Sequence, residues 1–272
     1  FSYTQEANAP CPFCANHCKR TIVRFSNGNS WVTNNRCERG EILGDPKDAS
    51  VRQQLADAKK SREQTPNLFK LRQELLFKDY PYPKAAKERD ITIGLPRVLS
   101  YWETMPFWTT FWRALGFKIQ LSDLSTRKIY EDGLSAVTSD TVCFPAKLVH
   151  GHLRNLAKKG VDRIFMPSIT TVTSENTEST SESMCAIVKG YPIVIRNSDN
   201  PEKRWHIPFD APLFHWYKRE DRNRQLTGYM EKTFGISPAE TRQAINVADA
   251  AEKQFHDEMH RAGKAVLDEV TA

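Results

Sequence analysis

Short apolar runs alternate with longer amphipathic segments through most of the chain. Residues 91–95, 117–121 and 161–166 are strand-length apolar runs bounded by turn residues, as in strands buried inside a parallel sheet. Residues 96–116 and 145–159 show the wider apolar spacing of helices, and each is closed by a glycine. Strands that alternate with helices in this way form βαβ units.

The pattern therefore predicts a doubly wound, mostly parallel, Rossmann-like α/β domain over residues 91–272. Residues 125–134 are expected to add a helix, and residues 236–270 a long, capped C-terminal helix. Two further apolar runs, 185–188 and 193–195, are interpreted as strands because they are rich in β-branched residues.

The first part of the chain, residues 1–45, has a different pattern. Residues 21–25 and 30–33 are strand-like and flank Asn27-Gly28, a pair that readily adopts the positive φ angles of a tight turn. This stretch is predicted to be a small cysteine-rich module built on a β-hairpin.

The segment between these regions, residues 46–90, is polar and rich in Lys, Arg and Gln. Its apolar spacing predicts one helix over residues 68–77, and its prolines predict that the rest is a linker.

Composition narrows the class of protein. The 272 residues carry 39 Lys and Arg against 33 Asp and Glu, and the signs are interspersed, which argues against a disordered chain or an acidic tail. Without a block of basic residues we expect no nucleic-acid partner, and without an apolar run of about 18 residues we expect no membrane span. The chain begins with Phe1 and has no secretory signal pattern, so we expect an internal piece of a longer protein.

The cysteines carry the clearest chemical signal. Cys11, Cys14, Cys18 and Cys37 form a C-x2-C-x3-C-x18-C pattern, and the predicted hairpin returns Cys37 toward the other three. Four thiolates around one point suit either Zn²⁺ or an iron–sulfur cluster, and a site carried on a hairpin favours structural zinc. Free cysteines in a loop-rich tail are the alternative. Clustered thiols in a chain of this size predict a reducing, cytoplasmic location rather than a disulfide framework.

Cys143 is a second candidate because it lies just before Pro145, a residue typical of the first turn of a helix. The helix dipole favours a thiolate at that position, near the edge of the sheet where α/β folds bind ligands. A buried, inert cysteine is the alternative reading. His150 and His152 are two residues apart and do not share a helix face, so at least one is expected to be a surface or capping residue.

Several segments together resemble one family. They are Ile93-Gly94-Leu95-Pro96-Arg97-Val98-Leu99, Met105-Pro106-Phe107-Trp108, Leu115-Gly116-Phe117, residues 143–152, and Arg36-Cys37-Glu38-Arg39-Gly40. On these segments nearly the whole chain is similar to the uncharacterised domain of large proteins related to the ATP-dependent activase of 2-hydroxyacyl-CoA dehydratases.

The resemblance implies a dehydratase-subunit-like domain that bears or contacts a [4Fe–4S] cluster and transfers low-potential electrons. Cys143 and Cys185 resemble two of the cluster ligands. The third ligand then comes from another domain or chain, or from Glu175 or Glu182, or no cluster forms. The implied partners are the activase and dehydratase-like domains of the parent chain, with a homodimer also possible.

No P-loop and no dinucleotide fingerprint is found, so no nucleotide site is expected in this chain. The chain alone is therefore not expected to turn over a substrate. A non-catalytic scaffold or docking module with a structural zinc site is the alternative function.

Overall fold

The computed structural model divides into two compact units, residues 1–67 and 68–272. The residues that the structure describes are 2–64, 66–172, 178, 182–216 and 218–271. None of the helices in these stretches combines the length and apolar character that a bilayer span requires.

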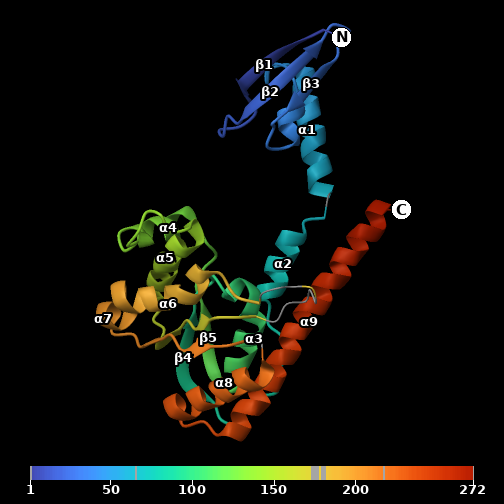
Figure 1. Cartoon of the computed structure of the whole chain (residues 1–272). Coiled ribbons are helices and arrows are strands. Elements are labelled where there is room, and N and C mark those ends of the chain that lie inside the picture. The colour runs from blue at the N-terminus through green and yellow to red at the C-terminus, as the bar shows by residue number, and fades with distance from the viewer. Residues whose placement is uncertain (1, 65, 173–177, 179–181, 217, 272) are drawn as a thin grey trace. The chain divides into compact units, whose positions relative to one another are not determined.

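The first unit is a small antiparallel sheet followed by helical segments (Figure 1). Its elements are β1 (Tyr3–Pro10), β2 (Lys19–Phe25), β3 (Ser30–Thr33), the 3₁₀ turn η1 (Glu38–Glu41) and α1 (Ala49–Gln64). The predicted hairpin is confirmed: β2 pairs with β3, and Gly28 in the turn has φ +88°. Strand β1 and helix α1 were not predicted.

The core of this first unit is very small. Ala9, Ile22 and Val32 are its clustered buried apolar residues, with Leu43 packed against them. Helix α1 is polar over most of its surface, which leaves little apolar area to stabilise the unit.

The second unit contains a four-stranded parallel sheet in the order β5-β4-β6-β8, so the predicted parallel α/β architecture is confirmed. The strands are β4 (Arg89–Leu95), β5 (Phe117–Leu121), β6 (Arg163–Phe165) and β8 (Phe209–Asp210). Beyond β6 and β8, the chain forms a second parallel pair, β7 (Ser168–Ile169) with β9 (Leu213–Phe214).

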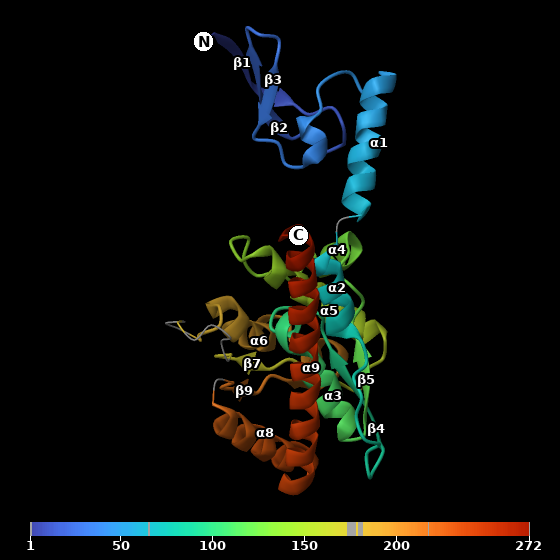
Figure 2. The same ribbon diagram turned by 90° about the vertical axis from the view of Figure 1, so that its right-hand side faces the viewer.

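Helices flank the sheet on both sides (Figures 1 and 2). One group packs around α3 and α9 and comprises α2 (Leu68–Phe77), α3 (Tyr101–Ala114), α8 (Arg219–Phe234) and α9 (Pro238–Thr271). The other packs around α5 and comprises α4 (Arg127–Leu134), α5 (Phe144–Lys158), α6 (Ala186–Ser198) and α7 (Pro201–Trp205). Bulky aromatic residues of α3, among them Trp108 and Trp112, fill the space next to the sheet.

Two glycines allow α4 and α5 to pack at very short range. A Cβ at Gly151 would lie 1.8 Å from the carbonyl oxygen of Ile129, and one at Gly133 would lie 2.3 Å from the nitrogen of Gly151. Neither position has room for a side chain. This close contact between α4 and α5 therefore fixes the position of α5, the helix whose N-cap is Cys143.

The strands predicted at 185–188 and 193–195 are wrong, because these residues belong to one helix, α6. Tyr191 and Ile195, one turn apart, are buried against the domain, whereas Ile193 and Val194 are exposed. Burial of one helical face therefore overrides the strand preference of a run of β-branched residues.

Candidate functional site

The carboxyl edge of the parallel sheet is the place where α/β folds bind ligands. From β4 the chain first adds β5 on one side and then β6 on the other, so the strand order reverses between β4 and β6. Helices α5 and α6 lead back toward the starts of β6 and β8 respectively. Their N-termini therefore face the carboxyl edge.

Cys143 and Cys185 are the N-cap residues of α5 and α6, and both thiols are exposed. The two helices pack against each other. Neither cysteine side chain caps its helix with a hydrogen bond. Cys143 is thus not the inert buried cysteine of the alternative reading, and Cys185 begins a helix rather than the expected strand. Both thiols lie at the N-terminal end of a helix.

A buried chain of polar side chains links α5, the helix that Cys143 caps, to α6. The Nε2 atom of His150 is 3.0 Å from the hydroxyl oxygen of Tyr191, and its Nδ1 atom is 2.7 Å from a carboxylate oxygen of Asp199. Arg204 pairs with the other oxygen of Asp199. Burial, followed by the charge of Cys143, raises the pKa of Tyr191. His150, on the helix that Cys143 caps, thus links a phenol to a carboxylate.

His152 lies on the same helix but in a different environment. Its ring nitrogens are 2.8 Å from the Oγ of Ser122 and 3.0 Å from the Oγ of Ser125. Burial and the nearby Arg97 charge lower its pKa to about 4, so the ring is neutral at pH 7. Both histidines are fully buried, and the expectation that one of them lies at the surface or caps a helix is wrong.

In the first unit, the backbone brings the two cysteine-bearing loops together. The amide of Cys11 donates to the carbonyl of Cys18 (2.9 Å), which closes the first loop. The guanidinium of Arg20 donates to the carbonyls of Gly40 (2.5 Å) and Ile42 (2.6 Å), which holds the segment after Cys37 against β2.

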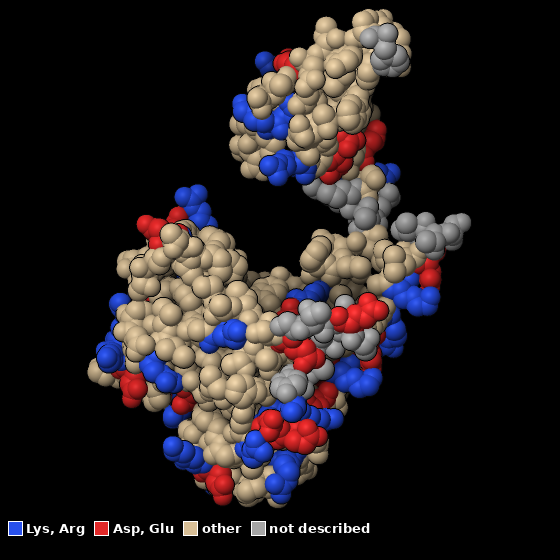
Figure 3. Space-filling view, in the orientation of Figure 1, with Lys and Arg blue, Asp and Glu red and all other residues tan. Residues whose placement is uncertain are grey.

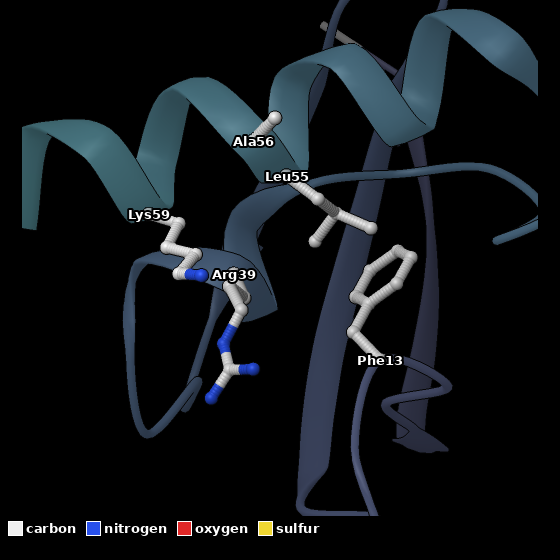
Figure 4. Close-up of a pocket in the computed structure, with 5 residues that line it drawn as sticks. All are labelled: Phe13, Arg39, Leu55, Ala56 and Lys59. Carbon is white, nitrogen blue, oxygen red and sulfur yellow. The ribbon is translucent and has the colours of Figure 1, made fainter.

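A pocket of about 440 Å³ lies where these loops meet α1. Figure 4 shows Phe13 of the first loop and Arg39 of the second bordering the same hollow, beneath Leu55 and Lys59 of α1. Phe13 precedes Cys14, and Arg39 follows Cys37 by two residues. The two loops that carry the metal-ligand pattern are therefore neighbours.

The thiols themselves are not gathered into a ligand sphere. Cys11 is buried, the sulfurs of Cys14, Cys18 and Cys37 belong to half-buried residues, and all four are free thiols. Across the described part of the chain, no three His, Cys, Asp or Glu side chains are arranged to hold one metal ion. Glu175, considered as a ligand for Cys143 and Cys185, lies outside the described residues.

A groove of about 890 Å³, here called the α9 groove, opens on the other side of the sheet. Its walls come from the first turn of α3, the segments after β7 and β9, and helices α8 and α9; they include Thr104, Val172, Trp216, Arg222, Asp249 and Glu252. Because α3 begins where β4 ends, and β7 and β9 continue beyond β6 and β8, the groove borders the carboxyl edge.

The groove was not predicted from the sequence, which contains only a weak indication of it. The guanidinium of Arg222 lies 2.8 Å from Asp249 and 5.1 Å from the ring centres of Phe107 and Trp216. Burial, and then the charges of Asp249 and Glu103, raise the pKa of Glu252 to about 7 against the opposing effect of Arg222. A charged residue on the apolar side of α9 was the one available hint.

Comparison with known proteins gives one family. The family model described as the CoA enzyme activase uncharacterised domain matches residues 92–272, which begin within β4 and cover the rest of the sheet and all of its flanking helices except α2. Searches of curated proteins and of solved structures returned no match. The chain therefore belongs to the family of the CoA enzyme activase uncharacterised domain.

Proposed function

We propose that this chain is a thiolate-bearing redox domain of a CoA enzyme activase-related protein. In this proposal Cys143 and Cys185 bear or contact an iron–sulfur cluster, through which low-potential electrons pass toward a 2-hydroxyacyl-CoA dehydratase-type reaction. The observation that carries it is the matched placement of two exposed thiols at the first residues of two packed helices on the carboxyl side of the sheet.

The residues of this chain do not complete such a cluster. A [4Fe–4S] cluster is held by four cysteine thiolates, and no third ligand joins the two thiols in the described residues. The missing ligands are therefore assigned to the activase or dehydratase-like domains of the parent protein, or to a second copy of this chain. Electron transfer belongs to that assembly rather than to this domain alone.

The test uses the full chain, supplied anaerobically with ferrous iron and sulfide. We expect absorbance in the sulfur-to-iron charge-transfer region that is lost in Cys143→Ala and in Cys185→Ala. Thr141→Ala is the matched control, because Thr141 is an exposed residue of the same loop and bears no thiol. Equal absorbance in the double cysteine variant and the wild type would contradict the proposal.

A second function, a scaffold or docking module with structural zinc at Cys11, Cys14, Cys18 and Cys37, is supported by the small core of the first unit. Three clustered apolar residues are too few to stabilise a module of this size without another source of free energy. Zinc would supply it by drawing the four thiolates of the neighbouring loops into one ligand sphere. Colourless protein that carries one zinc ion per chain and no iron would favour this second function.

A further inference from the structure

We infer that the α9 groove binds a small organic cation, an amine on an apolar or aromatic body, with the Glu252 carboxylate as its anchor. This inference is independent of the metal sites. It rests on the position of the groove, the pairing of its charges and the composition of its walls.

The position is that of a ligand site. The groove borders the carboxyl edge of the sheet, where the first turn of α3 meets the segments after β7 and β9. Its volume of about 890 Å³ is within the range of small-molecule pockets.

The cations along the groove already have partners. Arg222 and Arg219 both pair with Asp249, and Lys253 lies 2.6 Å from Asp257. Figure 3 shows the same interspersed pattern of acidic and basic side chains over the visible face of α8 and α9.

The carboxylates are likewise paired, with one exception. Glu103 lies 3.0 Å from Arg72. Glu252 makes no hydrogen bond and no ion pair with any described residue. A ligand that brings a positive charge therefore satisfies the carboxyl that the described residues leave unpaired, whereas an anion would meet cations that are already neutralised.

The charges that face Glu252 come from each element packed around it. They are Glu103 on α3, Arg222 on α8, and Asp249 and His256 on α9. Burial is the largest cause of the raised pKa of Glu252, and the two carboxylates add to it against the opposing charge of Arg222. An ammonium group would reverse this balance and hold Glu252 in its ionised form.

The side chains that line the groove indicate the shape and polarity of the rest of the ligand. Trp216, Val172 and Ala250 line the groove with aromatic and aliphatic surface. Thr104 uses its hydroxyl to donate to the carbonyl of Ser100 and keeps its oxygen as an acceptor. The site thus fits an apolar or flat body whose nitrogen group reaches Glu252.

The experiment measures binding of benzylamine to the full chain by calorimetry, with benzoate and benzyl alcohol as probes of the same shape. We expect saturable binding of benzylamine. Its affinity should fall about tenfold or more in Glu252→Gln, because the variant loses a hydrogen bond to a charged group. Glu231→Gln is the matched control, since Glu231 is an exposed carboxyl of α8 outside the groove. Affinity should also fall as the pH is lowered from 8 to 6, because Glu252 becomes protonated.

Several results would overturn the inference. They are the absence of benzylamine binding, equal affinity in Glu252→Gln and wild type, and tighter binding of benzoate than of benzylamine. Thermal unfolding of each variant separates lost binding from lost folding. Glu252→Asp keeps the carboxylate charge and is the variant to use if Glu252→Gln does not fold. Benzylamine binding by Glu252→Asp that weakens at low pH supports Glu252 as the anchor. Binding that does not depend on pH contradicts it.

Discussion

The two units of the chain are stabilised in different ways. The second unit has a continuous aromatic core around α3, in which Trp108 contacts Phe165 and Trp216 at ring-centre distances of 4.8 and 5.3 Å. The first unit buries one cluster of three small or medium apolar residues. The second unit therefore has an extended apolar core, whereas the first has a small one.

The cysteines of the two units also have different surroundings. In the first unit the cysteines lie in neighbouring loops, where a metal would be part of the fold. In the second unit Cys143 and Cys185 are exposed at helix ends of a domain that is already packed. Metal loss should therefore unfold the first unit and leave the second intact.

The largest expected effect follows from that contrast. Removing metal with a strong chelator under reducing conditions should unfold the first unit, because structural zinc contributes on the order of 10 kcal/mol to small domains. Hydrogen exchange should show β1 and β2 losing protection while β4 and β5 keep theirs. Restoring zinc is the control, and unchanged protection of β1 and β2 after chelation would contradict a structural metal.

The next effect is confined to the second unit. Trp108→Ala should lower its free energy of unfolding by about 3–5 kcal/mol, because it leaves a cavity in a core where Trp108 is fully buried. Urea unfolding followed by circular dichroism measures the loss. Trp31→Ala is the control: Trp31 is 59% exposed, so its loss should change stability by less than about 0.5 kcal/mol.

The third effect is a pH dependence specific to the second unit. The pKa of His152 is about 4 in the folded chain and 6.5 in the unfolded chain, so the unfolded state binds the proton first as the pH falls. Stability should decrease between pH 6.5 and 4, by up to about 3 kcal/mol. His152→Gln should flatten this part of the stability profile measured in urea. An identical profile in the variant would assign the pH dependence to other groups.

The smallest effect concerns the start of α4. The Oγ1 of Thr126 accepts a hydrogen bond from the amide of Ile129 (3.2 Å), so Thr126→Ala should cost about 1 kcal/mol. The measurement is again urea unfolding of the second unit. Thr138→Ala, at an exposed position outside any helix, should change nothing measurable, and equal losses in the two variants would argue against the cap.

Much of the fold could be predicted from apolar spacing. The hairpin, helix α2, strands β4 and β5 and helix α9 lie where the pattern puts them. Helices α1 and α8 were missed because their sequences are polar on most sides and show little apolar periodicity. Helix α6 was misread because its valines and isoleucines favour strands until packing against α5 is known.

The candidate sites likewise include parts that could be predicted from the sequence and parts that could not. A helix start at Cys143 could be predicted because Pro145 marks it locally. The link from His150 to Tyr191 and Asp199 could not, since 41 and 49 residues separate the partners. The α9 groove is assembled from five separate segments, and no local pattern relates Trp216 to Glu252.

The most direct test of the account is a metal count on the full chain, purified without oxygen and with its thiols reduced. We predict iron or zinc in fixed proportion to protein, with part lost in the Cys143→Ala/Cys185→Ala variant and the remainder lost in Cys37→Ala. We also expect the metal-bound thiols to resist alkylation. Metal-free protein in which all six cysteines react at once would contradict it.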